Sequence, residues 1–325
     1  MIWYPWLTPV YKQLVAQYTA ERDHHALLVQ SVPGCGDELL IQALGRWLMC
    51  QNRNGEKTCG VCHSCNLMKA GTHPDWLVIT PEKGKSSLGV DQIRQLTETL
   101  YSHAQQGGLK VAWIPQSEQL SEAAANALLK TLEEPPKNTY FLLGCHDPSQ
   151  LLATVRSRCF HWLLACPDED FSVQWLERQN SGNPGSFRTA LRLSNGAPVA
   201  AQQLLTSEVW GKRETVCQGL GVAFQQRDLL SLLPLLNHDN VEQRIHWAVS
   251  VLLDVVKYQQ GATSFIVNQD CFSTIQNMAG LSSAVILNQI SQKWLSCRHD
   301  LFTVAGVNRE LLLTNMLNQT DLLLA

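Results

Sequence analysis

Short apolar runs alternate with helical patterns over the first half of the chain, and this alternation limits the possible folds more than any other feature. The apolar runs lie at residues 26–30, 76–80, 110–114, 140–144 and 159–163. Apolar residues at helical spacing fall between them, at 38–50, 90–104 and 122–134. Strands joined by helical crossovers form a mostly parallel sheet with helices on both faces. We therefore expect an α/β domain at residues 1–165.

The pattern changes after this domain. Helical runs broken by glycine- and proline-containing turns follow, at 168–178, 185–194 and 197–205. They predict a small helical, lid-like domain at 166–206. Further along, helical spacing continues without competing strand signals, most clearly at Val241–Tyr258, whose apolar residues line one face. We expect a separate helical bundle at 207–325, so that the fold combines an α/β domain with two all-α parts.

The composition is globular, because 45% of the 325 residues are hydrophobic and 16% are charged, which suffices for the cores of two or three domains. The net charge of −3 shows no basic excess, so we expect any DNA contact to be weak or shared with partners. No apolar run reaches the ~18 residues of a membrane span. The opening Met1–Leu7 lacks the features of a signal peptide. We therefore expect a cytoplasmic protein.

Four of the eleven cysteines fall close together in the sequence: Cys50, Cys59, Cys62 and Cys65. Two overlapping Cys-x-x-Cys turns share Cys62, while Cys50 ends a predicted helix. Structural zinc sites use four tetrahedral protein ligands, and thiolates are among those that zinc prefers. A loop this short does not fold without a metal or a covalent staple. The spacing predicts a structural zinc site in an insertion at about residues 50–65.

Two other interpretations of the cysteines stay open at this point. A redox-active dithiol would need only one Cys-x-x-Cys pair. An iron–sulfur cluster also binds four thiolates, and their spacing in the sequence does not exclude it. His63 could replace one thiolate, although four cysteines already complete a zinc site.

A glycine-containing turn follows the first predicted strand, where a phosphate-binding loop would lie. The working motif G-x-x-x-x-G-K-[ST] places lysine on the phosphates and a hydroxyl on Mg²⁺. Here Gly34 and Gly36 remain, while Ser31 replaces the first glycine. Asp37 stands at the lysine position and Glu38 at the hydroxyl position. Two carboxylates at a helix N-terminus repel the anion that this geometry normally attracts, so we expect no ATP to bind at this site.

The magnesium-binding half of a nucleotide site is also missing. The predicted strand at 110–114 should end in Asp-Glu, but Pro115 and Gln116 follow it. Neither side chain holds the metal or acts as a general base. Glu118 and Glu122 lie further along, and we expect both to be solvated surface residues.

Two later motifs resemble a known family. The segment Asn126–Pro136, NALLKTLEEPP, resembles the signature of clamp-loader AAA+ subunits, and the Ser-Arg-Cys tripeptide at 157–159 resembles the SRC motif of the same family. The order of degenerate loop, cysteine cluster, signature and SRC motif also agrees. The segments Trp3–Leu7, His24–Leu28 and Gly71–Asp75 resemble one subunit type within this family. The resemblance covers essentially the whole chain.

The resemblance implies a role in DNA replication, as a non-hydrolysing subunit of the DNA polymerase III holoenzyme, a DNA-directed DNA polymerase complex. The partners that it implies are the gamma or tau ATPase subunits and the delta subunit, in a ring that loads the sliding clamp onto primed DNA. Residues 207–325 would form the collar of this ring. Arg158 matches the SRC arginine, which in the family reaches the ATP of the adjacent subunit, and Arg156 is a weaker candidate. A guanidinium beside a γ-phosphate stabilises the charge of phosphoryl transfer.

Further departures from the family's ATPases agree with the loss of nucleotide chemistry. The sensor-2 arginine expected after Gly196–Pro198 is Val199, and the polar sensor-1 position falls near Cys145. An active ATPase with unusual residues is disfavoured by Asp37 and Pro115. A zinc-dependent nucleic-acid-binding protein is disfavoured because no basic cluster surrounds the cysteines.

Overall fold

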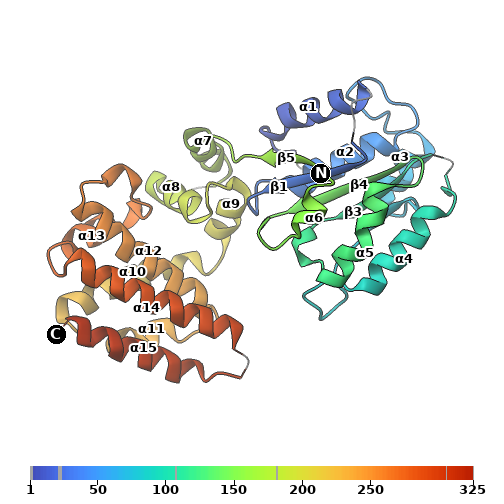
Figure 1. Ribbon diagram of the computed structural model, residues 1–325. Helices are drawn as coiled ribbons and strands as arrows, with labels where there is room; N and C mark the ends of the chain where they lie inside the picture. Colours follow the sequence, from blue (N-terminus) through green and yellow to red (C-terminus); the bar gives the residue numbers. More distant parts are fainter. Residues whose placement is uncertain (1–2, 21–23, 107, 181, 305, 325) are drawn as a thin grey trace. The chain divides into compact units, whose positions relative to one another are not determined.

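The computed structural model describes residues 3–20, 24–106, 108–180, 182–304 and 306–324 of the chain. The chain divides into two compact units, Met1–Pro167 and Asp168–Ala325. Figure 1 colours the first from blue to green and the second from yellow-green to red. Within the described residues, no helix combines the length and the apolar character that crossing a membrane requires.

A five-stranded sheet forms the centre of the first unit (Figure 1). Its strands are β1 (Ala26–Ser31), β2 (Trp76–Val78), β3 (Lys110–Ile114), β4 (Thr139–Cys145) and β5 (Phe160–Leu164). Their order across the sheet is β2-β3-β4-β1-β5, and every neighbouring pair is parallel. The predicted parallel sheet and its five strands are therefore confirmed.

Helices cover both faces of this sheet. They are α1 (Leu7–Thr19), α2 (Asp37–Met49), α3 (His63–Ala70), α4 (Val90–Tyr101), α5 (Glu122–Glu133) and α6 (Ala153–Arg156), with the 3₁₀ turn η1 (Ser117–Gln119). The apolar residues of α4, α5 and α6 share one cluster with the sheet, whereas α1 and α2 lie on the other side (Figure 1). Ser121 caps α5, because its hydroxyl accepts a hydrogen bond from Ala124 N at 3.2 Å.

The strand register explains why the apolar runs are continuous. Ala26 of β1 lies beside Phe141 of β4, and Leu28 lies beside Leu143. These four side chains belong to the cluster beneath α4 and α5. The intervening Leu27 points to the opposite face and is also buried. A strand covered on both faces must be apolar at every position, which removes the alternation seen in half-exposed strands.

Two close approaches in this unit require glycine. A Cβ atom on Gly45 of α2 would lie 2.1 Å from Cζ3 of Trp76, so α2 packs directly on the indole ring of β2. A Cβ atom on Gly144 of β4 would lie 2.1 Å from the carbonyl oxygen of Pro115. The carboxyl ends of β3 and β4 therefore meet closely, on the edge of the sheet where β1 also ends.

The second unit is helical throughout its described residues. Its helices are α7 (Glu169–Gln179), α8 (Pro184–Leu193), α9 (Pro198–Thr206), α10 (Trp210–Gln226), α11 (Leu233–Leu236), α12 (Val241–Gln259), α13 (Phe272–Met278), α14 (Ala284–Thr303) and α15 (Arg309–Leu324), with 3₁₀ turns η2 (Leu230–Leu232), η3 (Thr263–Phe265) and η4 (Gln269–Cys271). α7, α8 and α9 share a small apolar cluster, and the later helices share a larger one. The lid-like and bundle segments thus each have their own core.

Polar contacts join the lid-like helices to the bundle inside the second unit. Asp270 of η4 accepts a hydrogen bond from Thr189 of α8 at 3.0 Å and forms an ion pair with the buried Arg213 of α10 at 2.5 Å. Arg192 of α8 bonds to the carbonyl oxygen of Ile266 at 2.5 Å. These contacts explain why the two segments form one compact unit, while the division at 165/166 and 206/207 stays a prediction.

Some local features are not marked by the sequence pattern, because tertiary contacts decide them. α1 and α3 lie outside the helices expected from spacing. Asn240 stands at the N-cap of α12, but its side-chain oxygen accepts from Arg244 Nε at 2.9 Å and caps no backbone N–H. The charged partner one turn along competes for the oxygen that would otherwise cap the helix.

Candidate functional site

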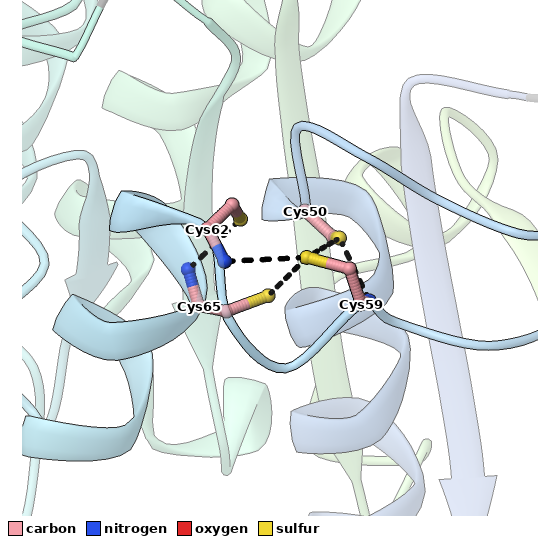
Figure 2. A group of neighbouring side chains, drawn as sticks. All are labelled: Cys50, Cys59, Cys62 and Cys65. Carbon is pink, nitrogen blue, oxygen red and sulfur yellow. Dashed lines mark hydrogen bonds between the residues drawn. The ribbon is translucent and has the colours of Figure 1, made fainter.

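The four clustered cysteines come from the end of α2, the loop after it and the start of α3. Cys50 directly follows α2, Cys62 is the N-cap residue of α3, and Cys65 lies in the first turn of α3. Figure 2 shows their side chains, with Cys59 from the connecting loop, directed toward one another. The sulfur atoms all lie within 4.8 Å of one another, so this group could hold a metal ion. His63 is exposed and is not part of the group.

The distances between sulfur atoms fit a single tetrahedral ion. Cys50 Sγ lies 3.6 Å from Cys59 Sγ, which lies 3.9 Å from Cys65 Sγ. Four sulfurs at the usual zinc–sulfur distance of about 2.3 Å form a tetrahedron with edges of about 3.8 Å. A polynuclear iron–sulfur cluster binds its cysteines through different iron atoms and so needs a wider ring of sulfurs. The geometry therefore favours one ion over a cluster.

Backbone N–H groups point at the sulfur atoms and favour their charged form. Cys59 N donates to Cys50 Sγ at 3.3 Å, and Cys62 N donates to Cys59 Sγ at 3.3 Å. Burial raises the pKa of the Cys62 thiol, but N–H groups of Cys65 and Gln51 outweigh burial and lower it to about 6. Burial raises the pKa of Cys65 to about 12. A bound cation would allow all four thiols to ionise together.

A buried serine ties the cysteine loop to the rest of the unit. Ser64 Oγ donates to the carbonyl oxygen of Met49 at 2.6 Å and lies 2.9 Å from Nε2 of His73. Nδ1 of His73 accepts from Asp75 N at 3.1 Å, so the imidazole proton belongs on Nε2, facing Ser64. Burial lowers the pKa of His73, which fits a neutral ring. Sequence analysis missed this support because its residues look ordinary and lie apart in the chain.

The opening segment of the chain packs against the degenerate phosphate loop. Gly34 and Gly36 both have positive φ, and Gly36 is the N-cap residue of α2. Trp6 Nε1 donates to the carbonyl oxygen of Cys35 at 2.8 Å. A Cβ atom on Gly36 would lie 2.9 Å from the ring of Tyr4. The loop keeps the backbone turn that a phosphate site needs, but aromatic side chains lie against it.

An internal ion pair involves the residue at the lysine position of this loop. Asp37 is 4% exposed, and its carboxylate lies 3.1 Å from Nε2 of His146. His146 directly follows β4, and its backbone N–H donates to Glu118 Oε1 at 3.1 Å. The expectation that Glu118 is a solvated surface residue is therefore wrong, because the fold turns η1 inward beneath His146. Glu122 is exposed, as expected.

His146 was missed by the sequence analysis, although one signal was present. It follows a predicted strand directly, and the carboxyl ends of parallel strands meet at one edge of a sheet. Asp37 raises the pKa of His146 by hydrogen bonding and outweighs burial, and Glu118 and Glu38 raise it further. The imidazole of His146 and the carboxylate of Asp37 therefore satisfy each other where a lysine would face phosphates.

Arg158 lies near the amino ends of the strands, whereas this loop lies at their carboxyl ends. It precedes β5, whose first residue, Phe160, is paired with Leu27 near the start of β1. The degenerate loop follows the other end of β1, where Ser31 is paired with Leu164. Because β1 and β5 run parallel, the structure does not bring Arg158 and the degenerate loop together. The cysteine cluster adjoins the other end of α2 and is therefore also separate from the degenerate loop.

The Arg158 side chain is held at the surface by two neighbouring helices. Its Nε donates to Oε1 of Glu133, the last residue of α5, at 2.6 Å. Its Nη1 donates to the carbonyl oxygen of Thr154 in α6 at 2.8 Å. The arginine is about one-third exposed and Glu133 about half exposed, so solvent or a partner molecule can reach the guanidinium.

Replacing His146 should change the pH dependence of stability. Because the pKa of His146 is raised in the folded chain, its ion pair with Asp37 contributes fully below the unfolded pKa of ~6.5 and is lost as pH rises through the raised value. His146→Gln should therefore lower the midpoint of urea denaturation more at pH 6 than at pH 9. The exposed His103 gives the control variant His103→Gln. An equal loss at both pH values would contradict the ion pair.

Known proteins match this chain along nearly its whole length. Residues 6–167 match the family described as "DNA polymerase III, delta subunit". Residues 167–206 match the family described as "DNA polymerase III subunit delta', AAA+ ATPase lid domain". Residues 207–321 match the family described as "DNA polymerase III, delta subunit, C terminal". The DNA polymerase III subunit delta' of Yersinia pestis is 58% identical over 98% of this chain and 95% of its own length. The DNA polymerase III subunit delta' of Escherichia coli K12 is 47% identical over 98% of this chain and 95% of its own length.

A more distant match covers about half of the chain. DNA polymerase III subunit tau of Escherichia coli K12 is 35% identical over 48% of this chain and 24% of its own length. The delta' relatives, in contrast, align over nearly the full length of this chain and of their own. The chain belongs to the family of DNA polymerase III delta' subunits.

Proposed function

We propose that this chain is a clamp-loader subunit that hydrolyses no ATP itself and presents Arg158 to ATP bound by a neighbouring subunit. The observation that carries the proposal is the position of Arg158. It lies near the amino ends of the strands, whereas the degenerate loop of the same chain lies at their carboxyl ends. An arginine placed there serves a nucleotide held by another chain. In a ring of similar subunits, one edge of each α/β domain faces the nucleotide side of the next.

The residues around the degenerate loop support the absence of hydrolysis. Asp37 replaces the phosphate-binding lysine and is already paired with His146. Pro115 and Gln116 follow β3, where magnesium ligands would stand. Without these groups the chain has no means to neutralise the phosphates or to activate water. This also explains why an arginine is the one catalytic group that it retains.

The proposed partners follow from the family and from the surface of the helical part. The gamma or tau ATPase subunits would receive Arg158, and the delta subunit would complete a ring that loads a sliding clamp onto primed DNA. We propose residues 1–165, 166–206 and 207–325 as the AAA+, lid and collar domains. Apolar side chains stay exposed on α14 and α15: Val285, Phe302, Leu311 and Leu322. We propose that these side chains contact helices of the neighbouring subunits in the collar.

We further propose that the four cysteines bind one structural zinc ion. All four ligands come from the protein, so no position stays open for substrate or water. The sulfur distances of 3.6 and 3.9 Å match a tetrahedral site. When bound, zinc would hold the loop at 50–65 between α2 and α3, where the short polar segment has little apolar surface to bury.

Replacing Arg158 should slow ATP turnover of the reconstituted complex without preventing its assembly. An arginine in this role contributes roughly 10³-fold or more at the site it serves, so Arg158→Ala should remove most turnover at one site of the ring. Arg158→Lys should recover little of it, because an ammonium lacks the planar fork. Arg156→Ala, two residues earlier, should have a smaller effect. Unchanged turnover with Arg158→Ala would count against the trans role.

The isolated chain should show no saturable binding of ATP. Titration with a fluorescent ATP analogue and Mg²⁺ measures this directly, with an isolated gamma or tau subunit as the positive control. The expected result follows from the Asp37 carboxylate at the lysine position and the missing magnesium ligands. Binding at micromolar concentrations would show that the degenerate loop still holds nucleotide.

The purified chain should contain about one zinc ion, measured by elemental analysis. Cys62→Ser should lose the metal and make the loop at 50–65 sensitive to proteolysis, because three thiolates hold the ion less tightly. Cys297→Ala, at a buried cysteine far from the cluster in sequence, should retain the metal. Removal of zinc by a chelator should lower the melting temperature of the wild type and leave that of Cys62→Ser unchanged.

A further inference from the structure

The guanidinium of Arg158 makes a specific set of contacts that its proposed role does not require. Both Nε and Nη2 bond to the same carboxylate oxygen of Glu133, the Nε bond at 2.6 Å. Nη1 bonds to the carbonyl oxygen of Thr154 at 2.8 Å and makes a longer contact with Ser157 Oγ at 3.5 Å. The side chain is therefore fixed in direction by acceptors on two helices.

These contacts leave part of the guanidinium available. Arginine carries five N–H donors in a rigid fork. Glu133 accepts hydrogen bonds from Nε and Nη2 of the guanidinium, and the carbonyl oxygen of Thr154 accepts one from Nη1. Within the described part of the chain, one hydrogen on Nη2 has no acceptor, and a second on Nη1 is engaged only by the long Ser157 contact. The Nη1 and Nη2 end of the guanidinium can thus donate hydrogen bonds to a second anion while Glu133 stays bound.

The acceptors are firmly placed, although the ion pair itself is exposed. Glu133 follows Leu132, which is 1% exposed, and Thr154 precedes Val155, which is fully buried. Both neighbours belong to the core cluster beneath the sheet. Exposed ion pairs contribute little to the stability of a fold. The pair is better explained by the direction that it gives to Arg158 than by any stabilisation of the first unit.

We propose that Glu133 is a positioning residue that holds Arg158 ready for the triphosphate bound by the adjacent subunit. The inference rests on the proposed trans role of Arg158. A free arginine loses side-chain freedom when it meets a phosphate, whereas a held one has already lost it. Glu133 thereby lowers the entropic cost of ordering the guanidinium each time the neighbouring site closes.

An inhibitory role for Glu133 would have the opposite effect on ATP turnover. If Glu133 withheld Arg158 from the phosphates, removing the carboxylate would free the arginine and raise turnover. Positioning predicts a fall in turnover, because the side chain would lose its fixed direction. The two arrangements are therefore separated by the sign of one measurement.

The test uses the complete complex, reconstituted with gamma or tau and delta subunits, with this chain carrying Glu133→Ala. We expect kcat for ATP at the one site that Arg158 serves to fall roughly three- to tenfold with little change in KM, less than for Arg158→Ala. Glu133→Gln should lose less, because its amide oxygen can still accept from Nε. Adding Glu133→Ala to Arg158→Ala should cause no further loss.

The matched control is Glu134→Gln, which neutralises the next carboxylate, an exposed one, and should leave kcat unchanged. Assembly of the complex and the melting temperature of each variant should match the wild type. If Glu133→Ala unfolds, the ATP turnover of Glu133→Gln tests the positioning role instead. Unchanged or faster turnover with the Glu133 variants, while Arg158→Ala is impaired, would overturn the positioning role alone. Unchanged turnover with Arg158→Ala would instead overturn the proposed function.

Discussion

The parallel direction of the five strands determines where every candidate group of the first unit can act. In a parallel sheet all carboxyl ends meet at one edge, and the segments that precede the strands meet at the other. Asp37 and His146 follow strands and lie close together, although they are 109 residues apart in the chain. Arg158 precedes β5 and is therefore kept away from them. A chain with this topology separates the loop after β1 from an arginine that precedes β5, and the proposed trans role of Arg158 rests on this separation.

The sheet and the separate helical parts were predictable because their signals are local. Continuous apolar runs indicate strands buried on both faces, and β1 with Leu27 and Leu28 is such a strand. The cysteine spacing likewise predicted a group that the fold brings together. Glu118 was misjudged, because its distance from the strand in sequence gave no indication that His146 would cover it. Contacts between residues far apart in the chain depend on the completed sheet, so no local pattern contains them.

The cysteine loop shows how a segment with little apolar surface can still be fixed in place. Ser64 and His73 connect it to the end of α2 through hydrogen bonds with assigned directions. The backbone N–H groups around the sulfurs add fixed partial charges. These contacts orient the loop, while a metal ion would supply the cross-link that orientation alone lacks. The candidate site therefore depends as much on its serine and histidine supports as on its four thiols.

The pairing of Asp37 with His146 has a consequence for any attempt to engineer a phosphate site at this loop. Asp37→Lys would not rebuild a phosphate site, because the new ammonium would meet the histidine that now depends on the carboxylate. Glu118 would still turn inward, and the ring of Tyr4 would still lie against Gly36. Each of these residues contacts another around the loop, so lysine at position 37 alone would leave the other obstacles to phosphate binding in place. A phosphate site at this loop would therefore require several coordinated substitutions rather than one.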